Sequence, residues 1–381
     1  MEGLVNLNSF AGIYSGKTVL VTGHTGFKGA WLSLWLKLLG ARVIGYSLQP
    51  PTQPALFEEL RLSNELKHVF GDIRDLNGLK DVLASSQPEI VFHLAAQPLV
   101  RLSYEQPVDT FSTNIMGTVN LLEAVRSVSS VRACVLVTSD KCYENKEWPY
   151  AYRENDSMGG YDPYSASKGC SELVAASMRS SYFPPSSYDK HRVAIATARA
   201  GNVIGGGDWA LDRIFPDAIR ALSQKIAVPV RNPFSIRPWQ HVLEPLSGYL
   251  WLAARMFESG SDFAEAWNFG PLTSSAVNVK SIVEKIISVW GGGDINDLSS
   301  GQTSAPHEAN FLRLDCSKAT GKLGWQPVFS VDEAIEYAAK WYRGYYCSDR
   351  FNARDFSESQ IFSYTERAAS LSVSWAKHSG S

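Results

Sequence analysis

The sequence feature that most constrains the fold is a glycine-spaced segment that directly follows an apolar run. The run Lys17–Thr22 has the composition of a buried strand and leads into Gly23, Gly26 and Gly29, after which residues 30–39 have helical periodicity. Glycines at this spacing permit a tight turn, let the backbone approach a pyrophosphate and allow a helix to pack closely on a strand. Elsewhere the same spacing can be a structural turn only. Between a strand and a helix it predicts a dinucleotide-binding site.

Apolar runs and helical segments alternate along the first half of the chain. Strands are predicted at residues 17–22, 42–46, 89–94 and 132–138, and helices at residues 30–39, 107–128 and 162–179. This alternation indicates an α/β fold, a Rossmann-type doubly wound parallel sheet with helices on both faces. Ligands in that architecture bind beyond the carboxyl ends of the strands.

Beyond residue 200 the pattern loosens, and the chain divides into three expected parts. A dinucleotide-binding Rossmann domain is expected over residues 15–200. A smaller, mainly substrate-binding lobe is expected over residues 201–345, and segments of it can return to the sheet. Residues 346–381 are rich in Ser and lack strong periodicity, so we expect a weakly ordered C-terminal extension there.

Charge and cysteine content exclude several classes of protein. A formal net charge of −2 without basic stripes argues against binding to nucleic acid or to a membrane surface. The five cysteines are scattered and include no CxxC pair, which is typical of reduced thiols and not of a disulfide framework or a zinc site. No apolar stretch reaches membrane-spanning length, and the N-terminus lacks the pattern of a secretory leader. We therefore expect a soluble, cytoplasmic protein without a metal.

The motif "YSASK" places Tyr164 and Lys168 four residues apart in a predicted helix, so both side chains project from one face. A phenol has a reference pKa of about 10, but a neighbouring ammonium and a positively charged nicotinamide favour the phenolate. Tyr164 can then accept a hydroxyl proton while hydride leaves the same carbon. Alone, the pair is more typical of a solvated helix face. Together with the glycine loop it indicates hydride-transfer chemistry.

The motif "TSDKCY" places a hydroxyl, a carboxylate and an amine at the end of an apolar strand. These groups belong to Ser139, Asp140 and Lys141. Such a turn can be an exposed ion pair on the surface. It can also supply catalytic groups, because strand ends face the ligand in this architecture.

Taken together, the motifs resemble the extended short-chain dehydrogenase/reductases that act on nucleotide sugars. The resemblance covers roughly residues 15–345 and rests on the glycine loop, "HLAAQ", Asn114, Ser139, "YSASK" and "LGWQP". Within that family the chain is similar to the branch that dehydrates CDP-D-glucose, through "TGHTGFKG", "AAQPLVRLSYEQP", "TSDKCYEN", "GGYDPYSASKGCSE", "RAGNVIGGGDWA" and "RNPFSIRPWQHVLEPLSGY". The implied product is CDP-4-keto-6-deoxy-D-glucose, a precursor of deoxysugars in surface polysaccharides such as O-antigen.

This chemistry needs an acid and a base in addition to Tyr164. Oxidation at C4 acidifies the C5 proton, the C6 hydroxyl then leaves by β-elimination, and hydride returns to C6. The resemblance implies that Ser139 hydrogen-bonds the C4 oxygen and that protonated Asp140 donates to the departing C6 hydroxyl. Lys141 stands where dehydratases of dTDP-glucose carry a Glu base. It can be the base, orient the sugar or stabilise the enolate.

The resemblance also implies cofactor and substrate contacts. The cofactor-binding positions are Gly23, His24, Gly26, Phe27, Lys28, Gly29, Asp72, Ile73, Leu94, Ala95, Ala96, Asn114, Tyr164 and Lys168. The positions for sugar, diphosphate and base are Asn202, Arg213, Arg237, His307 and Glu308. Asp72, in "GDIRD" after a strand, can accept the adenine amino group or instead cap the next helix.

The cofactor that we expect is NAD. The second strand ends at Gly45, Tyr46 and Ser47, without the acidic residue that usually holds the adenosine ribose of NAD. Lys28 in the glycine loop could instead meet the 2′-phosphate of NADP. A reaction that is redox-neutral overall needs a resident cofactor rather than a reducing pool, and the similar dehydratases use NAD.

Two other functions stay open. A nucleotide-sugar 4-epimerase or reductase needs the glycine loop, Tyr164 and Lys168, but has no evident use for Asp140 and Lys141. A non-catalytic dinucleotide-binding scaffold has no evident use for the set of catalytic side chains. A homodimer or higher homo-oligomer is also expected, because similar enzymes pair the two helices that precede and carry "YSASK" across a two-fold axis.

Overall fold

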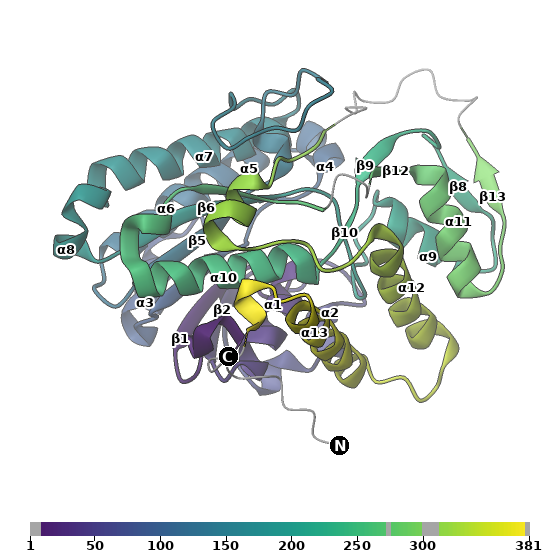
Figure 1. The fold of residues 1–381 in the computed structure, drawn as a ribbon, viewed down its shortest axis with the longest axis horizontal. Helices are drawn as coiled ribbons and strands as arrows, with labels where there is room; N and C mark the ends of the chain where they lie inside the picture. Colours follow the sequence, from purple (N-terminus) through teal and green to yellow (C-terminus); the bar gives the residue numbers. More distant parts are fainter. Residues whose placement is uncertain (1–8, 272–275, 299–311, 378–381) are drawn as a thin grey trace.

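Seven parallel strands form the centre of the molecule. The computed structural model describes residues 9–271, 276–298 and 312–377. Across the sheet the strands lie in the order β3, β2, β1, β4, β5, β6 and β11, and every neighbouring pair is parallel (Figure 1). Their bounds are β1 Thr18–Thr22, β2 Arg42–Ser47, β3 Lys67–Phe70, β4 Ile90–His93, β5 Ala133–Val137, β6 Ala194–Ala200 and β11 Ala266–Phe269. The predicted doubly wound sheet is confirmed, and its order reverses between β1 and β4, where ligands bind in such folds.

Helices cover both faces of this sheet. Successive residues of a strand point to opposite faces, so Val19 and Val21 pack in one apolar cluster and Leu20 packs in the other. The first cluster includes α1 (Phe27–Leu38) and α10 (Leu243–Ser259), and the second includes α3 (Leu76–Ser86), α6 (Gly117–Arg126) and α7 (Pro163–Tyr182). Burial on both faces explains why the central strands read as continuous apolar runs.

Beyond residue 200 the chain forms smaller sheets and also returns to the central one. Within the described residues, two-stranded sheets pair β7 (Val203–Ile204) with β10 (Gln240–His241), β8 (Val228–Val230) with β13 (Ile295–Asp297), and β9 (Ile236–Pro238) with β12 (Ala276–Asn278). The helices of this part are α9 (Ile214–Ser223), α11 (Val279–Trp290) and α12 (Val331–Cys347). β11 lies against β6, with Ala266 opposite Thr197.

One long predicted helix is interrupted. Residues 107–128 form α5 (Pro107–Phe111), a π-helical turn at Ser112–Met116 and then α6. The π turn adds one residue to a helical turn, and such insertions often occur at functional sites. The remaining short helices are α2 (Leu56–Glu59), α4 (Val100–Glu105) and α8 (Tyr188–His191). Among the described helices, none has both the length and the apolar character needed to cross a bilayer.

The C-terminal extension differs from the sequence expectation because it forms a packed helix. α13 spans Ala353–Ser370 and lies near α1 (Figure 1). Its buried side chains include Ser357, Ile361, Tyr364 and Ala368, which have helical spacing. Two of these four are small, so the apolar periodicity is weak in the sequence.

Aromatic stacking holds the end of the extension against the Rossmann part of the chain. Trp375 stacks on Phe10 with the ring centroids 4.8 Å apart. Tyr364 meets Trp35 of α1 edge-on at 5.8 Å. The two ends of the described chain therefore share one apolar cluster with the central sheet.

A buried carboxylate joins the extension to α10. Glu244 accepts hydrogen bonds from the backbone N–H groups of Val328 at 3.0 Å and Phe329 at 2.7 Å, and from the Tyr364 hydroxyl at 2.8 Å. Burial raises the pKa of Glu244 to about 7, although these donors oppose the shift. One side chain thus connects three segments that are distant in the sequence.

Replacing Glu244 with Gln is expected to lower the free energy of unfolding by about 1–3 kcal/mol, because an amide nitrogen would face buried donors and leave one without an acceptor. The midpoint of denaturant unfolding measures the change. Glu258→Gln, at an exposed position of the same helix, is the matched control and should leave the midpoint unaltered. Equal midpoints for the two variants would contradict this role of Glu244.

Candidate active site

The glycine loop forms the tight turn that its spacing predicts. Gly23 has a φ of +74°, and a Cβ there would lie 2.7 Å from the backbone nitrogen of Ala95. A Cβ on Gly29 would lie 2.0 Å from the Gly23 carbonyl oxygen, so α1 packs directly on the end of β1. A Cβ on Gly26 would meet only that same oxygen, at 3.4 Å. Neighbouring backbone therefore leaves no space for a side chain at Gly23 or Gly29. At Gly26, beside the first turn of α1, the backbone has free space next to it.

Histidine 24 is a packed residue beneath β2. A Cβ on Gly45 would lie 2.4 Å from the His24 ring, so β2 needs a glycine there. The ring meets Phe57 edge-on, with centroids 5.1 Å apart. Burial, aided by the neighbouring His68, lowers the pKa of His24 to about 4, so the ring is neutral. His24 supports the loop from below.

Lysine 28, on the first turn of α1, faces catalytic side chains. Burial lowers the pKa of Lys28 to about 8; Arg213 and Lys168 lower it further, while Asp140 and Asp208 raise it. These charged neighbours follow β5 and β6 or lie on α7, and none belongs to β2. The structure therefore gives no support to a contact between Lys28 and a 2′-phosphate at the end of β2, where Ser47 instead bonds Thr25 at 2.8 Å.

The turn after β5 gathers the three polar groups of "TSDKCY". Asp140–Cys142 form a 3₁₀ turn, and Ser139 caps it by accepting a hydrogen bond from the Lys141 N–H at 3.2 Å. The Ser139 hydroxyl donates to Asp140 Oδ1 at 3.0 Å. Asp140 is only 5% exposed, so this turn is not the exposed ion pair considered as an alternative.

The environment of Asp140 favours its protonated form. Burial raises the pKa of this carboxyl, and the opposing effects of Lys141, the Ser139 hydrogen bond, Lys28 and Arg237 do not cancel the rise. Gly201 makes room for the side chain, since a Cβ there would lie 2.8 Å from Asp140 Oδ2. A carboxylic acid kept neutral can donate a proton during catalysis.

Helix α7 brings Tyr164 and Lys168 close to the turn that follows β5. The helix begins after Asp162, whose side chain caps it by accepting from the Ser165 N–H at 2.9 Å. Tyr164 is 9% and Lys168 is 6% exposed, so the pair does not form a solvated helix face. Lys168 Nζ donates to the carbonyl oxygen of Val137, at the end of β5, at 3.3 Å. The two motifs therefore meet at the carboxyl edge of the sheet.

The pKa of Tyr164 moves opposite to the expectation from sequence. Burial raises it to about 12, and the lowering effects of a hydrogen bond with Ser139 and of the Arg213 charge are smaller. Burial also lowers the pKa of Lys168 to about 8, although Glu172 opposes this. Burial of an acid and a base favours the uncharged form of each, and here burial is the largest cause of both shifts.

The π turn directs Asn114 inward. Its side chain exchanges two hydrogen bonds with the backbone of Gln97, at 2.8 and 3.1 Å, and donates to Ser167 Oγ at 2.8 Å. Asn114 thus connects α7 to the segment that follows β4. In that segment, the backbone N–H groups of Leu94 and Ala95 donate hydrogen bonds to Thr22 at the end of β1. These two residues and Ala96 directly follow β4.

Asp72 has a different partner from either of those considered. The cap of α3 is Asp75, whose side chain accepts from the Asn77 N–H at 3.0 Å, so the capping interpretation of Asp72 is wrong. The Asp72 carboxylate pairs with Arg74, with 2.6 Å between Oδ2 and Nη2. The next residue, Ile73, is buried against Gly117 of α6. A contact of Asp72 with adenine stays a prediction.

The residues predicted to bind the substrate fall into three groups. Arg213 lies close enough to Tyr164 for their charges to interact, and Arg237 lies close enough to Asp140, which is compatible with the predicted roles of both arginines. The backbone oxygen of Asn202 accepts from the Gln240 N–H at 3.2 Å, which holds β7 beside β10. His307 and Glu308 lie outside the described residues.

The partner of Arg213 is an aspartate that none of the sequence motifs indicated. Asp208, directly after the triple glycine, is buried and bonds Arg213 Nη1 at 2.6 Å. The backbone of Asp208 is held in turn by the Tyr342 hydroxyl of α12, at 2.8 and 2.5 Å. An acidic residue five positions before an arginine was the available signal, but the spacing alone does not show that Asp208 is buried and paired with Arg213.

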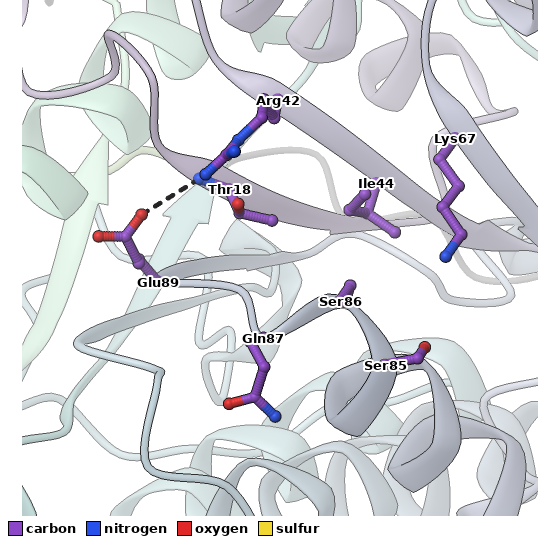
Figure 2. Close-up of a pocket in the computed structure, with 8 residues that line it drawn as sticks. All are labelled: Thr18, Arg42, Ile44, Lys67, Ser85, Ser86, Gln87 and Glu89. Atoms are coloured by element: carbon purple, nitrogen blue, oxygen red, sulfur yellow. Dashed lines mark hydrogen bonds between the residues drawn. The ribbon is translucent and has the colours of Figure 1, made fainter.

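A hollow at the opposite edge of the sheet is not part of this site. Figure 2 shows it at the amino ends of β1 and β2 and the end of α3, where Glu89 accepts from the Thr18 N–H at 3.2 Å. Its lining residues are Thr18, Arg42, Ile44, Lys67, Ser85, Ser86, Gln87 and Glu89. Ligands of doubly wound sheets bind at the other strand ends.

As for metals, the described residues contain no group of three or more His, Cys, Asp or Glu placed to hold an ion.

Comparison with known proteins places the chain in a family. Residues 20–338 match the family model described as GDP-mannose 4,6 dehydratase. A CDP-glucose 4,6-dehydratase from Salmonella typhimurium is 55% identical over 332 residues, which cover 87% of this chain and 92% of the relative.

Solved structures agree in fold. The dTDP-glucose 4,6-dehydratase from Bacillus anthracis, solved in complex with NAD, is 19% identical with a TM-score of 0.69, covering 86% of this chain and 96% of that one. UDP-glucose 4-epimerase from Brucella ovis, also in complex with NAD, is 23% identical with a TM-score of 0.72, covering 86% of this chain and 99% of that one. With the match of the family model and the 55% identity, these findings show that the chain belongs to the GDP-mannose 4,6 dehydratase family, within the extended short-chain dehydrogenase/reductases.

Proposed function

We propose that this protein is a hydro-lyase that converts CDP-D-glucose to CDP-4-keto-6-deoxy-D-glucose and water, with NAD as its cofactor. The 55% identity to a CDP-glucose 4,6-dehydratase supports the substrate and the reaction. The structural observation that carries the proposal is Asp140, a buried acid of raised pKa bonded to the serine that also bonds Tyr164. Hydride transfer alone has no use for this acid, whereas elimination of water requires one.

The residues around the glycine loop fit a dinucleotide. The open backbone at Gly26 and the N-terminal turn of α1 would hold the pyrophosphate, and Tyr164 and Lys168 would face the nicotinamide end. When bound, NAD supplies a hydride acceptor for C4, a hydride donor for C6 and a positive charge that favours the phenolate of Tyr164. Two solved structures of the same fold contain NAD.

In the first step, Tyr164 accepts the proton of the C4 hydroxyl. The Ser139 hydroxyl holds the C4 oxygen, because it lies between Tyr164 and Asp140 and bonds both. Lys168 stabilises the phenolate as an ammonium from the next turn of the helix. The resulting 4-keto group makes the C5 proton acidic enough to be removed.

In the second step, Asp140 protonates the C6 hydroxyl so that it leaves as water. Lys141, on the same turn, acts at C5, either as the amine that takes the C5 proton or as the ammonium that stabilises the enolate while a water molecule takes that proton. Each turnover therefore gives Tyr164 a proton and takes one from Asp140, and a proton passes from Tyr164 to Asp140 through solvent before the next turnover. The hydride returns to C6 and a proton returns to C5, so the product differs from the substrate by one water.

The charges around the turn suit a diphosphate. Lys141, Lys28 and Arg237 interact electrostatically with Asp140, and Lys28 and Arg213 with Asp208. Lys168 lies near Lys28. Arginine recognises phosphate oxygens through its planar fork of donors, and Arg213 is held in place by Asp208 at 2.6 Å. We assign Arg213 and Arg237 to the diphosphate, and Asn202 to the sugar.

A homodimer is the assembly that we propose. Helices α5 to α7 expose apolar side chains, among them Val108 at 81% and Leu173 at 60%, with Met116 and Tyr182 also exposed. Isolated exposed apolar residues are common, but a set on neighbouring helices is typical of an interface. A second copy would cover these helices across a two-fold axis.

The product would enter deoxysugar synthesis for surface polysaccharides such as O-antigen.

Asp140→Asn is expected to reduce formation of the 6-deoxy product by roughly 10²- to 10⁴-fold, because the amide keeps the shape but cannot give up a proton. In deuterated water the variant should still return CDP-hexose labelled at C5, since oxidation and proton removal do not need Asp140. Native activity should fall as pH rises through the raised pKa of Asp140. Asp189→Asn, at an exposed position, is the control. An unimpaired Asp140→Asn enzyme would favour the epimerase or reductase alternative.

Isotope tracing tests the reaction itself. CDP-D-glucose deuterated at C4 should give a product with deuterium at C6, and unlabelled substrate in deuterated water should give a product with deuterium at C5. Nuclear magnetic resonance of the product reads both positions, with Tyr164→Phe as the inactive control. Solvent deuterium at C6 in place of the C4 label would refute the proposed hydride return.

Leu173→Glu is expected to weaken the dimer, because it places a charge in the apolar face of α7. Light scattering after size-exclusion chromatography should show a shift toward the monomer mass. Leu211→Glu, which changes another exposed leucine outside these helices, should leave the mass unaltered. A native protein that is already monomeric at micromolar concentration would refute the proposed assembly.

A further inference from the structure

A buried chain of hydrogen bonds connects the two ends of the catalytic turn, which comprises residues 139–142. Glu172 of α7 accepts from Thr138 Oγ1 at 2.5 Å and from Arg199 Nη2 at 2.7 Å. Arg199 of β6 also donates from Nη1 to the Tyr143 hydroxyl at 2.7 Å. Thr138 directly precedes the turn and Tyr143 directly follows it, so both ends are held. We call Thr138, Glu172, Arg199 and Tyr143 the turn clamp.

The turn clamp is anchored in the surrounding structure. The Tyr143 hydroxyl donates to Asn268 Oδ1 of β11 at 2.7 Å. Asn268 Nδ2 donates in turn to the backbone oxygens of Tyr152 at 2.9 Å and Asp315 at 3.1 Å. Through these contacts the turn clamp is fixed to β11 and to the backbone of Tyr152 and Asp315, all of which lie outside the turn.

The same helix carries the clamp and the hydride-transfer pair. Tyr164, Lys168 and Glu172 follow one another at intervals of four, so they share one face of α7. Lys168 bonds the Val137 carbonyl and Glu172 bonds the next residue, Thr138. The position of the turn relative to Tyr164 and Lys168 is thus set by two adjacent contacts between α7 and the end of β5.

Stability alone does not account for a buried ion pair here. The side chains of Glu172 and Arg199 are both buried, and a buried pair is often no more stabilising than apolar residues of similar volume. Burial by itself would raise the pKa of Glu172, but the bonds from Arg199, Thr138 and Thr197 hold it below its ordinary value. The ionised carboxylate accepts directional hydrogen bonds, which restrict position more than apolar contacts do.

We propose that the turn clamp sets the position of Asp140 for the elimination step, and that its four members are positioning residues of the reaction. None of the four needs to touch the sugar, because each acts through the backbone of residues 139–142. This inference rests on the proposed dehydratase function, since elimination is the step that uses Asp140.

A matched pair of threonines tests the clamp. Thr197 of β6 also donates to Glu172, from Oγ1 to Oε2 at 2.7 Å, but it lies away from the turn. Thr138→Val and Thr197→Val each remove one hydroxyl bond to the same carboxylate. We expect Thr138→Val to lower kcat for the 6-deoxy product roughly 10- to 100-fold with little change in KM, as misplaced catalytic groups do. Thr197→Val should keep kcat within a few-fold, with a similar shift in melting temperature.

The pattern of losses distinguishes positioning from general damage. The turn carries Ser139 and Lys141 as well as Asp140, so in deuterated water Thr138→Val should lower both C5 exchange of CDP-D-glucose and formation of the 6-deoxy product, with no larger fall in melting temperature than Thr197→Val. Tyr143→Phe loosens the other end of the turn and should show the same pattern. Equal losses of kcat in the two threonine variants would overturn the clamp. Failure of the native enzyme to dehydrate CDP-D-glucose would instead refute the proposed function.

Discussion

The contact between the end of β1 and the first turn of α1 is the constraint on which the rest of the structure depends. A side chain on Gly29 would overlap the Gly23 carbonyl, so only glycine lets the helix lie so close. From this position Trp31 of α1 donates to the Gly206 carbonyl at 2.9 Å. A Cβ on Gly206 would in turn lie 2.1 Å from the Trp341 ring. The glycine loop, the triple glycine and α12 are therefore packed as one unit around the carboxyl edge of the sheet.

Burial at that edge shifts acids and bases in opposite directions. It raises the pKa of Asp140 and lowers the pKa values of Lys28 and Lys168 to about 8. Desolvation of both kinds of group brings their pKa values closer together than in water, which makes proton exchange near neutral pH less costly. The same burial raises the pKa of Tyr164, so in the proposed mechanism a cationic cofactor would favour the phenolate. Hydride acceptor and proton acceptor would then be coupled through charge.

The features predicted correctly from sequence are local ones. The strands, the glycine turn and the spacing of Tyr164 and Lys168 depend on residues close together in the chain, which periodicity and spacing report directly. The features that were missed depend on distant partners: Asp208 holding Arg213, Glu172 paired with Arg199, and Glu244 receiving the C-terminal extension. α13 was missed for a related reason, because the cluster it joins contains Phe10 and Trp35 from the other end of the chain.

By itself the sequence determined the fold class and the glycine loop, because each follows from local spacing and residue chemistry, and it predicted the reacting side chains through their motifs and the family resemblance. Tertiary structure alone decided which charges are buried, and hence that the pKa of Asp140 is raised and that Lys28 lies near Asp140 and Lys168. It also decided that Thr138 and Tyr143 both hydrogen-bond to the buried ion pair of Glu172 and Arg199. The physical reason is that desolvation and directional hydrogen bonds depend on neighbours in space, and those neighbours come from segments far apart in the chain.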